Sequence, residues 1–248
     1  MSFELKEEKG KSYYIINSFE ETNLVKHIFS TKIGWNLDNT IDNLLNIFNI
    51  YSENIAISNQ VHDTNIVYVD DIFYYKKRRE KEGIDGLITD KANIVLVTYY
   101  ADCVPLFFLD TVNKVVGLAH AGWRGTIANI GGKMIKTMKE IFNSNPSNIL
   151  VGIGPSIGPC CYEVGIDVYD SFQEATFPLN NVLYSRGNDK WYLNLWQANE
   201  NILVANGVPK DNITVSRLCN SCNVDKFYSY RKEKGTKERM VAAIKLVG

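Results

Sequence analysis

Three short runs of β-branched and aromatic residues follow one another with only three to five residues between them. The runs are Ile94–Tyr100, Val104–Leu109 and Val115–Ala119. Their length and composition are typical of buried strands. Because no helix fits into such short gaps, we expect these strands to adjoin in a mixed sheet rather than in a purely parallel one.

A helix is expected after these strands. From Thr126 to Phe142 apolar residues recur at helical spacing. Gly131 and Gly132 lower the helix propensity inside this segment, which indicates close packing against a sheet. A second helix is expected at Leu195–Ala205, where Gly207 provides a normal C-terminal stop.

Further short segments complete the expected sheets: Asn65–Val69, Ile149–Ile153, Ile213–Leu218, Phe227–Arg231 and Met240–Val247. No linker rich in Pro, Gly or Ser divides the chain, and no internal repeat is present. The sequence therefore predicts an α+β (mixed α/β) fold, with residues 1–248 forming a single domain.

The charge balance limits the partners of the chain. Lysine and arginine number 27 and aspartate and glutamate 28, so no basic excess is available to displace counterions from a nucleic acid. The apolar stretches are too short to span a bilayer, and Met1–Glu7 lacks the features of a signal peptide. We expect a cytoplasmic protein, a monomer or weak homodimer, with neither nucleic-acid nor membrane partners.

Three residues form a candidate metal centre. His62 and His120 lie in contexts typical of strand ends, and Cys103 interrupts an apolar region between them. Imidazoles and a thiolate suit Zn²⁺, and three protein ligands leave a fourth position open for water or substrate. The separations of 41 residues (62 to 103) and 17 residues (103 to 120) match no short zinc motif. Spacing alone therefore leaves structural histidines and a buried cysteine as alternatives.

The segment after His120 has the features of an anion site. Gly122 allows close backbone approach, Thr126 is a suitable N-cap, and Arg124 offers a bidentate donor. Trp123 is placed to stack on an aromatic ring such as a base. The alternative is a capped helix with this tryptophan packed in the core.

The remaining four cysteines form two pairs. Cys160 and Cys161 are adjacent in a loop rich in Gly and Pro, and Cys219 and Cys222 form a C-x-x-C pair. Together they have the ligand number of a Cys₄ metal site, but adjacent cysteines rarely bind one metal ion. Without an export signal a disulfide scaffold is not expected. We therefore expect buried free thiols here.

Seven segments carry a resemblance to a known family: Gln60–His62, Asp85–Thr89, Ala101–Pro105, Ala119–Gly125, Gly154–Gly158, Cys160–Glu163 and Tyr228–Arg231. The chain resembles the laccase-domain or polyphenol oxidase family, also described as purine nucleoside phosphorylases with adenosine deaminase activity. The resemblance extends from about Phe29 to Leu246. It implies a layered α/β/β/α sandwich with mixed sheets.

The resemblance also implies the site. His62, Cys103 and His120 would bind the metal and form the catalytic centre, with zinc as the metal and copper as the alternative. The residues implied to bind a purine nucleoside and phosphate are Gln60, Arg124, Lys32 and Arg231. The chain departs from the family pattern at Lys32, where arginine is usual, and at Asp63 and Glu238, where glycine is usual.

The activity implied is zinc-dependent phosphorolysis of adenosine, inosine or methylthioadenosine to the base and a sugar 1-phosphate, together with adenosine deamination. One metal with an open position suits both reactions. The candidate general acids are Asp63, Asp102 and Glu163.

Four alternatives remain. A copper-dependent polyphenol oxidase would need many more than the three histidines present. A Cys–His hydrolase would use Cys103 as a nucleophile activated by His120. A further alternative is an enzyme for a cell-wall nucleotide precursor. A purely structural zinc module would unfold without its metal.

Overall fold

Two six-stranded sheets form the centre of the protein in the computed structural model, which describes residues 2–185, 187 and 190–247. Sheet I has the strand order β1 (Phe3–Glu8), β2 (Lys11–Ile16), β3 (Val25–Ser30), β15 (Met240–Leu246), β7 (Val95–Tyr100), β4 (Ile55–Ile57). Sheet II has the order β14 (Ile213–Val215), β10 (Ile149–Ile153), β8 (Val104–Asp110), β9 (Val115–Ala121), β6 (Gly86–Thr89), β5 (Ile66–Tyr68).

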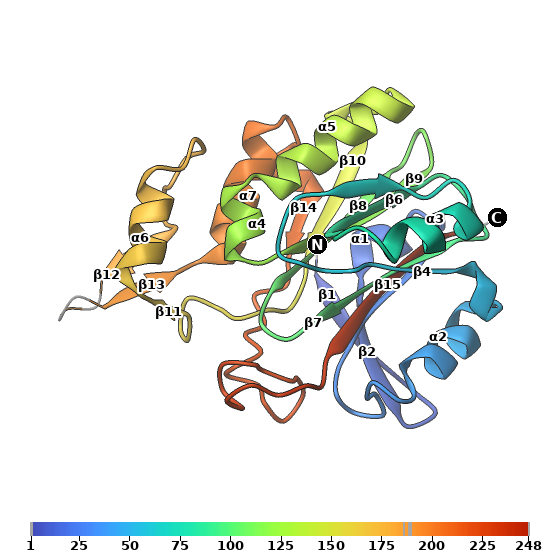
Figure 1. Cartoon of the computed structure of the whole chain (residues 1–248), viewed down its shortest axis with the longest axis horizontal. Coiled ribbons are helices and arrows are strands. Elements are labelled where there is room, and N and C mark those ends of the chain that lie inside the picture. Colours follow the sequence, from blue (N-terminus) through green and yellow to red (C-terminus); the bar gives the residue numbers. More distant parts are fainter. Residues whose placement is uncertain (1, 186, 188–189, 248) are drawn as a thin grey trace.

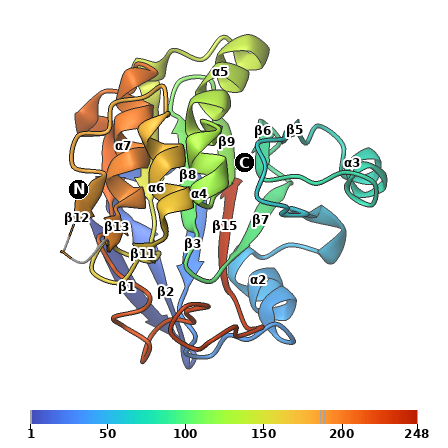
Figure 2. The same ribbon diagram turned by 60° about the vertical axis from the view of Figure 1, so that its left-hand side comes forward.

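Helices cover the outer faces of both sheets (Figures 1 and 2). Sheet II carries α4 (Trp123–Ile127), α5 (Ile130–Phe142) and α7 (Leu195–Ala205), and sheet I carries α2 (Thr40–Phe48). The other elements are α1 (Asn17–Glu20), α3 (Ile72–Arg79), α6 (Ile166–Gln173), and 3₁₀ turns at Ser52–Asn54, Pro146–Asn148 and Lys210–Asn212. A small sheet of β11 (Glu163–Val164), β13 (Trp191–Leu193) and β12 (Leu183–Ser185) stands beside α6 at the left of Figure 1.

The alternation of side chains explains the layers. In β8, Leu106 and Phe108 pack toward the helices, whereas Phe107 and Leu109 pack toward sheet I. All four side chains are buried, so this strand is apolar on both faces. The layered α/β/β/α sandwich is confirmed. The sheets are also mixed, because β8 pairs antiparallel with β9 while β10 pairs parallel with β14.

The helix predicted over Thr126–Phe142 was wrong as one element. Asn129 adopts a left-handed conformation with φ 63°, which ends α4. Its side chain accepts a hydrogen bond from the N–H of Gly132 and so caps α5. Thr126 is not an N-cap, because it lies buried inside α4 after the cap residue Gly122.

The expected close packing against a sheet is confirmed for Gly131 but not for Gly132, whose added Cβ atom would meet the side chains of Asn129 and Asn206. A Cβ atom on Gly131 would lie 3.4 Å from Ile202 of α7 and 3.7 Å from Leu106 of β8. The closest neighbour is therefore α7, and the sheet comes second. A larger residue at this position would separate α5 from α7 and from sheet II.

The strand predicted at 227–231 was also wrong. This segment turns instead, with the N–H of Glu233 bonded to the carbonyl of Ser229 and that of Gly235 to the carbonyl of Tyr230. The other expected strands are present, although β14 ends at Val215. Among the described residues, no helix is both long and apolar enough to cross a bilayer.

Candidate metal centre

His62 lies in a turn that one buried carboxylate holds in place. The backbone of His62 has φ 64°, a left-handed value that costs energy for a residue with a side chain. The N–H groups of Val61, His62 and Asp63 all donate to the carboxylate of Asp85, at 3.1, 3.0 and 3.0 Å. Three converging N–H groups bind an anion well, so Asp85 stabilises the strained turn.

The same carboxylate orients His120 at the end of β9. Oδ1 of Asp85 lies 2.7 Å from Nδ1 of the His120 ring. The backbone N–H of His120 also donates to the backbone carbonyl of Asp85. Asp85 is fully buried. A histidine that gives Nδ1–H to a carboxylate presents Nε2 to a metal, and such a carboxylate fixes the ring and increases its basicity.

Cys103 completes the centre in the connection between β7 and β8. The ligand atoms of His62, Cys103 and His120 all lie within 4.8 Å of one another. A Cβ atom on Gly122 would lie 3.1 Å from the His62 ring and 3.2 Å from the Cys103 sulfur. Glycine is therefore needed here so that the backbone can pass behind the ligands.

The electrostatics of the cluster favour metal binding. Burial raises the pKa of the Cys103 thiol, but His120 and His62 lower it more, to about 6. Burial likewise raises the pKa of Asp85, yet the hydrogen bonds from His120, Asp63 and Val61 hold it below its usual value. The two histidines therefore favour the thiolate, the form in which cysteine binds metals.

The donor set fits zinc. Two imidazoles and a thiolate are borderline-soft ligands that zinc accepts in tetrahedral geometry, and three protein ligands leave one position open. The carboxylate behind His120 is the usual outer partner of a metal-binding histidine.

A cavity of about 600 Å³ lies in front of the three ligands. Much of its wall is aromatic, and two arginines reach it. The lining residues are Gln60, His62, Tyr99, Ala101, Asp102, Cys103, His120, Trp123, Ile157, Tyr162, Tyr230, Arg231 and Arg239. Such a cavity suits a ligand with one planar ring and one anionic group.

The residues expected to bind substrate divide into two groups. Gln60 and Arg231 line the cavity, whereas Arg124 and Lys32 are not among its lining residues. The Gln60 amide makes two 2.8 Å hydrogen bonds to the backbone of Tyr99, so it fixes the segment before His62. The guanidinium of Arg124 lies 4.3 Å from the Trp123 ring centroid.

Lys32 is held by another loop. Its ammonium donates to the carbonyl of Val224, and its N–H donates to the carbonyl of Lys226. The two other departures from the family pattern also have local partners. The Asp63 carboxylate accepts from the N–H of Thr64, and Glu238 accepts from the N–H of Leu37.

Of the three candidate acids, Asp102 lines the cavity. Its Oδ2 accepts the N–H of Arg231 at 2.7 Å, and its carbonyl accepts the N–H of Ile157. Glu163 instead interacts with Lys190 and Tyr192. Asp102 directly precedes Cys103. It therefore ties the segments of Arg231 and Ile157 to the loop that carries this ligand.

Sequence reasoning missed the roles of Asp85 and Arg239. Arg239 reaches the cavity while donating to the carbonyls of Thr236 and Glu238. For Asp85 one signal was available: a charged residue between Ile84 and Gly86, at the start of a strand that is otherwise apolar.

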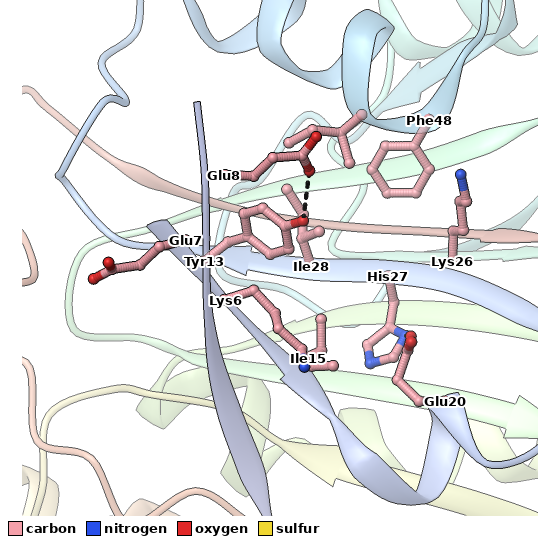
Figure 3. A pocket seen from close by; sticks show the side chains of 11 residues that line it. Lys6, Glu7, Glu8, Tyr13, Ile15, Glu20, Lys26, His27, Ile28 and Phe48 are labelled. Carbon is pink, nitrogen blue, oxygen red and sulfur yellow. Dashed lines mark hydrogen bonds and ion pairs between the residues drawn. The ribbon is translucent and has the colours of Figure 1, made fainter. Parts of the chain in front are cut away.

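The third histidine lies elsewhere. His27 lines a separate cavity of about 370 Å³ over β1, β2 and β3, where Glu20 approaches it (Figure 3). Its Nε2 accepts the N–H of Ile16 at 2.7 Å, and its Nδ1 lies 3.5 Å from Glu20 Oε1. Burial lowers the pKa of His27 to about 3. Its role is therefore structural, as a neutral acceptor.

We expect His27 to make folding sensitive to acid. The pKa is about 3 in the folded chain and near 6.5 when unfolded, so its contribution is complete above pH 6.5 and is lost as the pH falls toward 3. At pH 5 the free energy of unfolding should be lower by roughly 2 kcal/mol than at neutral pH for this reason alone. Gln accepts the same hydrogen bond without titrating, so urea unfolding of His27→Gln should lack this component. Identical pH dependence of both proteins would contradict this assignment.

Comparison with known proteins agrees with this architecture. The family described as multi-copper polyphenol oxidoreductase laccase matches residues 18–247. Purine nucleoside phosphorylase SSP1584 of Staphylococcus saprophyticus is 32% identical over 247 residues, covering 96% of this chain and 88% of the relative. Purine nucleoside phosphorylase YlmD of Geobacillus stearothermophilus is 44% identical over 163 residues, covering 65% of this chain and 60% of the relative.

Solved structures show the same fold. The crystal structure of YlmD from Geobacillus stearothermophilus matches with a TM-score of 0.85 at 31% identity and covers 99% of each chain. The crystal structure of the Bacillus licheniformis hypothetical protein YfiH matches with a TM-score of 0.87 at 29% identity and covers 98% of each chain.

Fold and sequence together place the chain in an enzyme family. It belongs to the family of laccase-like polyphenol oxidoreductases, whose curated relatives here are named purine nucleoside phosphorylases.

Proposed function

We propose that the chain is a zinc-dependent purine nucleoside phosphorylase that also deaminates adenosine. The observation that carries this proposal is the position of the His62, Cys103 and His120 cluster in the wall of an aromatic cavity that two arginines also line. The names of the relatives support the same substrate class.

The cavity offers separate surfaces for the parts of a nucleoside. Tyr99, Trp123, Tyr162 and Tyr230 provide faces on which a purine can stack. Arg231 lies over the Tyr162 ring, with 5.3 Å between the guanidinium carbon and the ring centroid. A base stacked on these rings would lie beside a fixed positive charge. A zinc ion bound by the three ligands would act as a Lewis acid on the departing base or activate water for deamination.

The phosphate is the nucleophile in phosphorolysis, and we assign its binding to the arginines. Arg231 and Arg239 reach the cavity. Arg124 directly follows Trp123, and Trp123 lines the cavity. Planar guanidinium groups bind phosphate oxygens in pairs. Lys32 contributes less in this assignment, because it does not line the cavity and its ammonium donates to the carbonyl of Val224 in another loop.

Arg124→Ala and Arg231→Ala are each expected to raise the KM for phosphate roughly 10-fold or more, and the KM for the nucleoside much less. The reason is the loss of charge-assisted hydrogen bonds to the anion. Steady-state kinetics with phosphate and inosine varied separately provide the measurement. Lys32→Ala is the matched control and should change either KM by less than about threefold. Equal effects on both substrates would show that an arginine supports the fold rather than the anion.

A Cys–His hydrolase remains the second candidate, because one observation favours it. Cys103, His120 and Asp85 form a chain of nucleophile, base and orienting carboxylate. This hydrolase would stay active after chelation, whereas the proposed phosphorylase would lose activity with its metal. A multi-copper oxidase is disfavoured, because only two of the three histidines reach the centre.

The direct test uses purified, zinc-loaded protein. Adenosine without phosphate should yield inosine alone, and added phosphate should yield adenine, hypoxanthine and ribose 1-phosphate. Inosine and methylthioadenosine should react only when phosphate is present. Failure to release any base from these nucleosides in the presence of phosphate would sink the proposal and favour another substrate, such as a cell-wall nucleotide precursor.

A further inference from the structure

Four cysteines outside the metal centre converge at one point. Cys160 and Cys161 lie in the loop between β10 and β11, and Cys219 and Cys222 lie in the loop between β14 and β15. The four sulfur atoms all lie within 4.8 Å of one another. The Cys222 sulfur lies 3.4 Å from that of Cys160 and 3.4 Å from that of Cys161. The sequence-based expectation of buried thiols was wrong for Cys160 and Cys222, which are exposed, and holds fully only for Cys219, since Cys161 is half-buried.

The spacing of these sulfurs is compatible with one shared metal ion. With zinc–sulfur bonds of about 2.3 Å, tetrahedral geometry places the sulfurs about 3.8 Å apart. The observed 3.4 Å contacts are far longer than the roughly 2.05 Å of a disulfide bond. All four cysteines are free thiols in the structure. Four sulfurs from two distant segments therefore lie close enough together to share one metal ion.

The turn at 158–162 explains how adjacent cysteines can share one metal. The N–H groups of Cys161 and Tyr162 both donate to the carbonyl of Gly158, which curls the chain around this point. The N–H of Gly158 also donates to the Cys219 sulfur at 3.2 Å. Backbone N–H donors to sulfur are a common means of stabilising metal-bound thiolates.

We propose that Cys160, Cys161, Cys219 and Cys222 bind a second, structural metal ion of the thiophilic divalent class, with zinc as the ion. Four protein ligands close the coordination shell, so this ion has no open position and is not catalytic. Thiolate ligands exclude magnesium and calcium, which take oxygen donors.

The second site would connect both loops of the cavity wall. Ile157 and Tyr162 reach the cavity from the loop of Cys160, and Tyr230 and Arg231 reach it from the loop of Cys222. Backbone hydrogen bonds already join the loops, between the N–H of Asn220 and the carbonyl of Ser156 and between the N–H of Ser156 and the carbonyl of Leu218. The metal would lock this junction. This inference does not depend on the proposed activity.

Metal analysis of protein purified without oxygen and loaded with zinc tests the second site. The intact chain is expected to carry about two zinc ions, and Cys222→Ser about one. His120→Ala should also carry about one zinc ion. In this variant the ion of the cavity should be lost and the ion at the four cysteines retained. Asp225→Ala, an exposed change in the same loop, should keep both. An unchanged zinc content in Cys222→Ser would overturn the proposal.

A second measurement needs no variant and so does not depend on how Cys222→Ser folds. Thiol titration of the zinc-loaded chain with a disulfide reagent should show these four cysteines protected, and a chelator should release them together. Rapid reaction of Cys160 and Cys222 in the zinc-loaded chain would show that they are ordinary exposed thiols and that no second metal is bound. Cobalt substitution in the His120→Ala variant should give the strong sulfur-to-metal absorption of a thiolate site, and its absence would count equally against the proposal.

Discussion

His62→Ala, Cys103→Ala and His120→Ala are each expected to lose the metal of the cavity and to lower kcat/KM for phosphorolysis roughly 1,000-fold or more. Each variant removes one of three protein ligands, and a two-ligand site holds zinc weakly. Deamination should fall together with phosphorolysis, because both reactions are assigned to the same ion. The measurements are metal content and initial rates with inosine and adenosine.

The third histidine provides the control for these variants. His27 lies outside the cavity, so His27→Gln should retain zinc and nearly full activity at neutral pH. If a ligand variant kept both its zinc and its rate, that residue would be removed from the centre. If the metal-free Cys103→Ser protein deaminated adenosine at full rate, the shared-metal assignment would be wrong.

The second large effect is expected for Asp85→Asn. This change keeps the size of the side chain but turns one carboxylate oxygen into an N–H₂ donor that faces N–H groups. The turn of His62 then loses part of its anchor, and His120 loses its charged partner. We expect zinc affinity to fall about 10- to 100-fold and the free energy of unfolding to fall by about 1–3 kcal/mol.

Chelator competition measures the first effect of Asp85→Asn, and urea unfolding measures the second. Asp63→Asn is the matched control, because Asp63 is exposed and its carboxylate accepts only from the neighbouring Thr64 among the contacts described. It should change both quantities little. A zinc affinity within twofold of the original in Asp85→Asn would show that the carboxylate does not tune the centre.

Much of the fold followed from local patterns. Strands β7, β8 and β9 are short runs of β-branched and aromatic residues, whose length and composition favour buried strands. The helix at Leu195–Ala205 has the predicted bounds. The break at Asn129 was not predictable from periodicity, because the apolar spacing continues through it. The segment 227–231 has strand-like composition, but it makes its hydrogen bonds within a local turn.

The candidate centre could be predicted only in part, because it depends on contacts between segments that are distant in sequence. Ligand chemistry singled out His62, Cys103 and His120, whereas their convergence depends on which strands of sheet II become neighbours. Asp85 acts through four hydrogen bonds from two distant segments. No spacing along the chain encodes such an arrangement. The cysteine cluster shows the same limit, since two loops about 60 residues apart in sequence meet only in the folded chain.

The single carboxylate behind the centre also couples the ligand set to the register of sheet II. Asp85 can accept the turn of His62 and the ring of His120 at the same time only when β6 is paired with β9, where Gly86 lies opposite Ala119. Closing this 33-residue separation (86 to 119) is a non-local step, which is slow compared with forming a turn or a helix. The complete set of three ligands therefore exists only where this pairing has formed. A bound ion would thus report on the register of sheet II, because a slipped β9 would carry His120 away from the other two ligands.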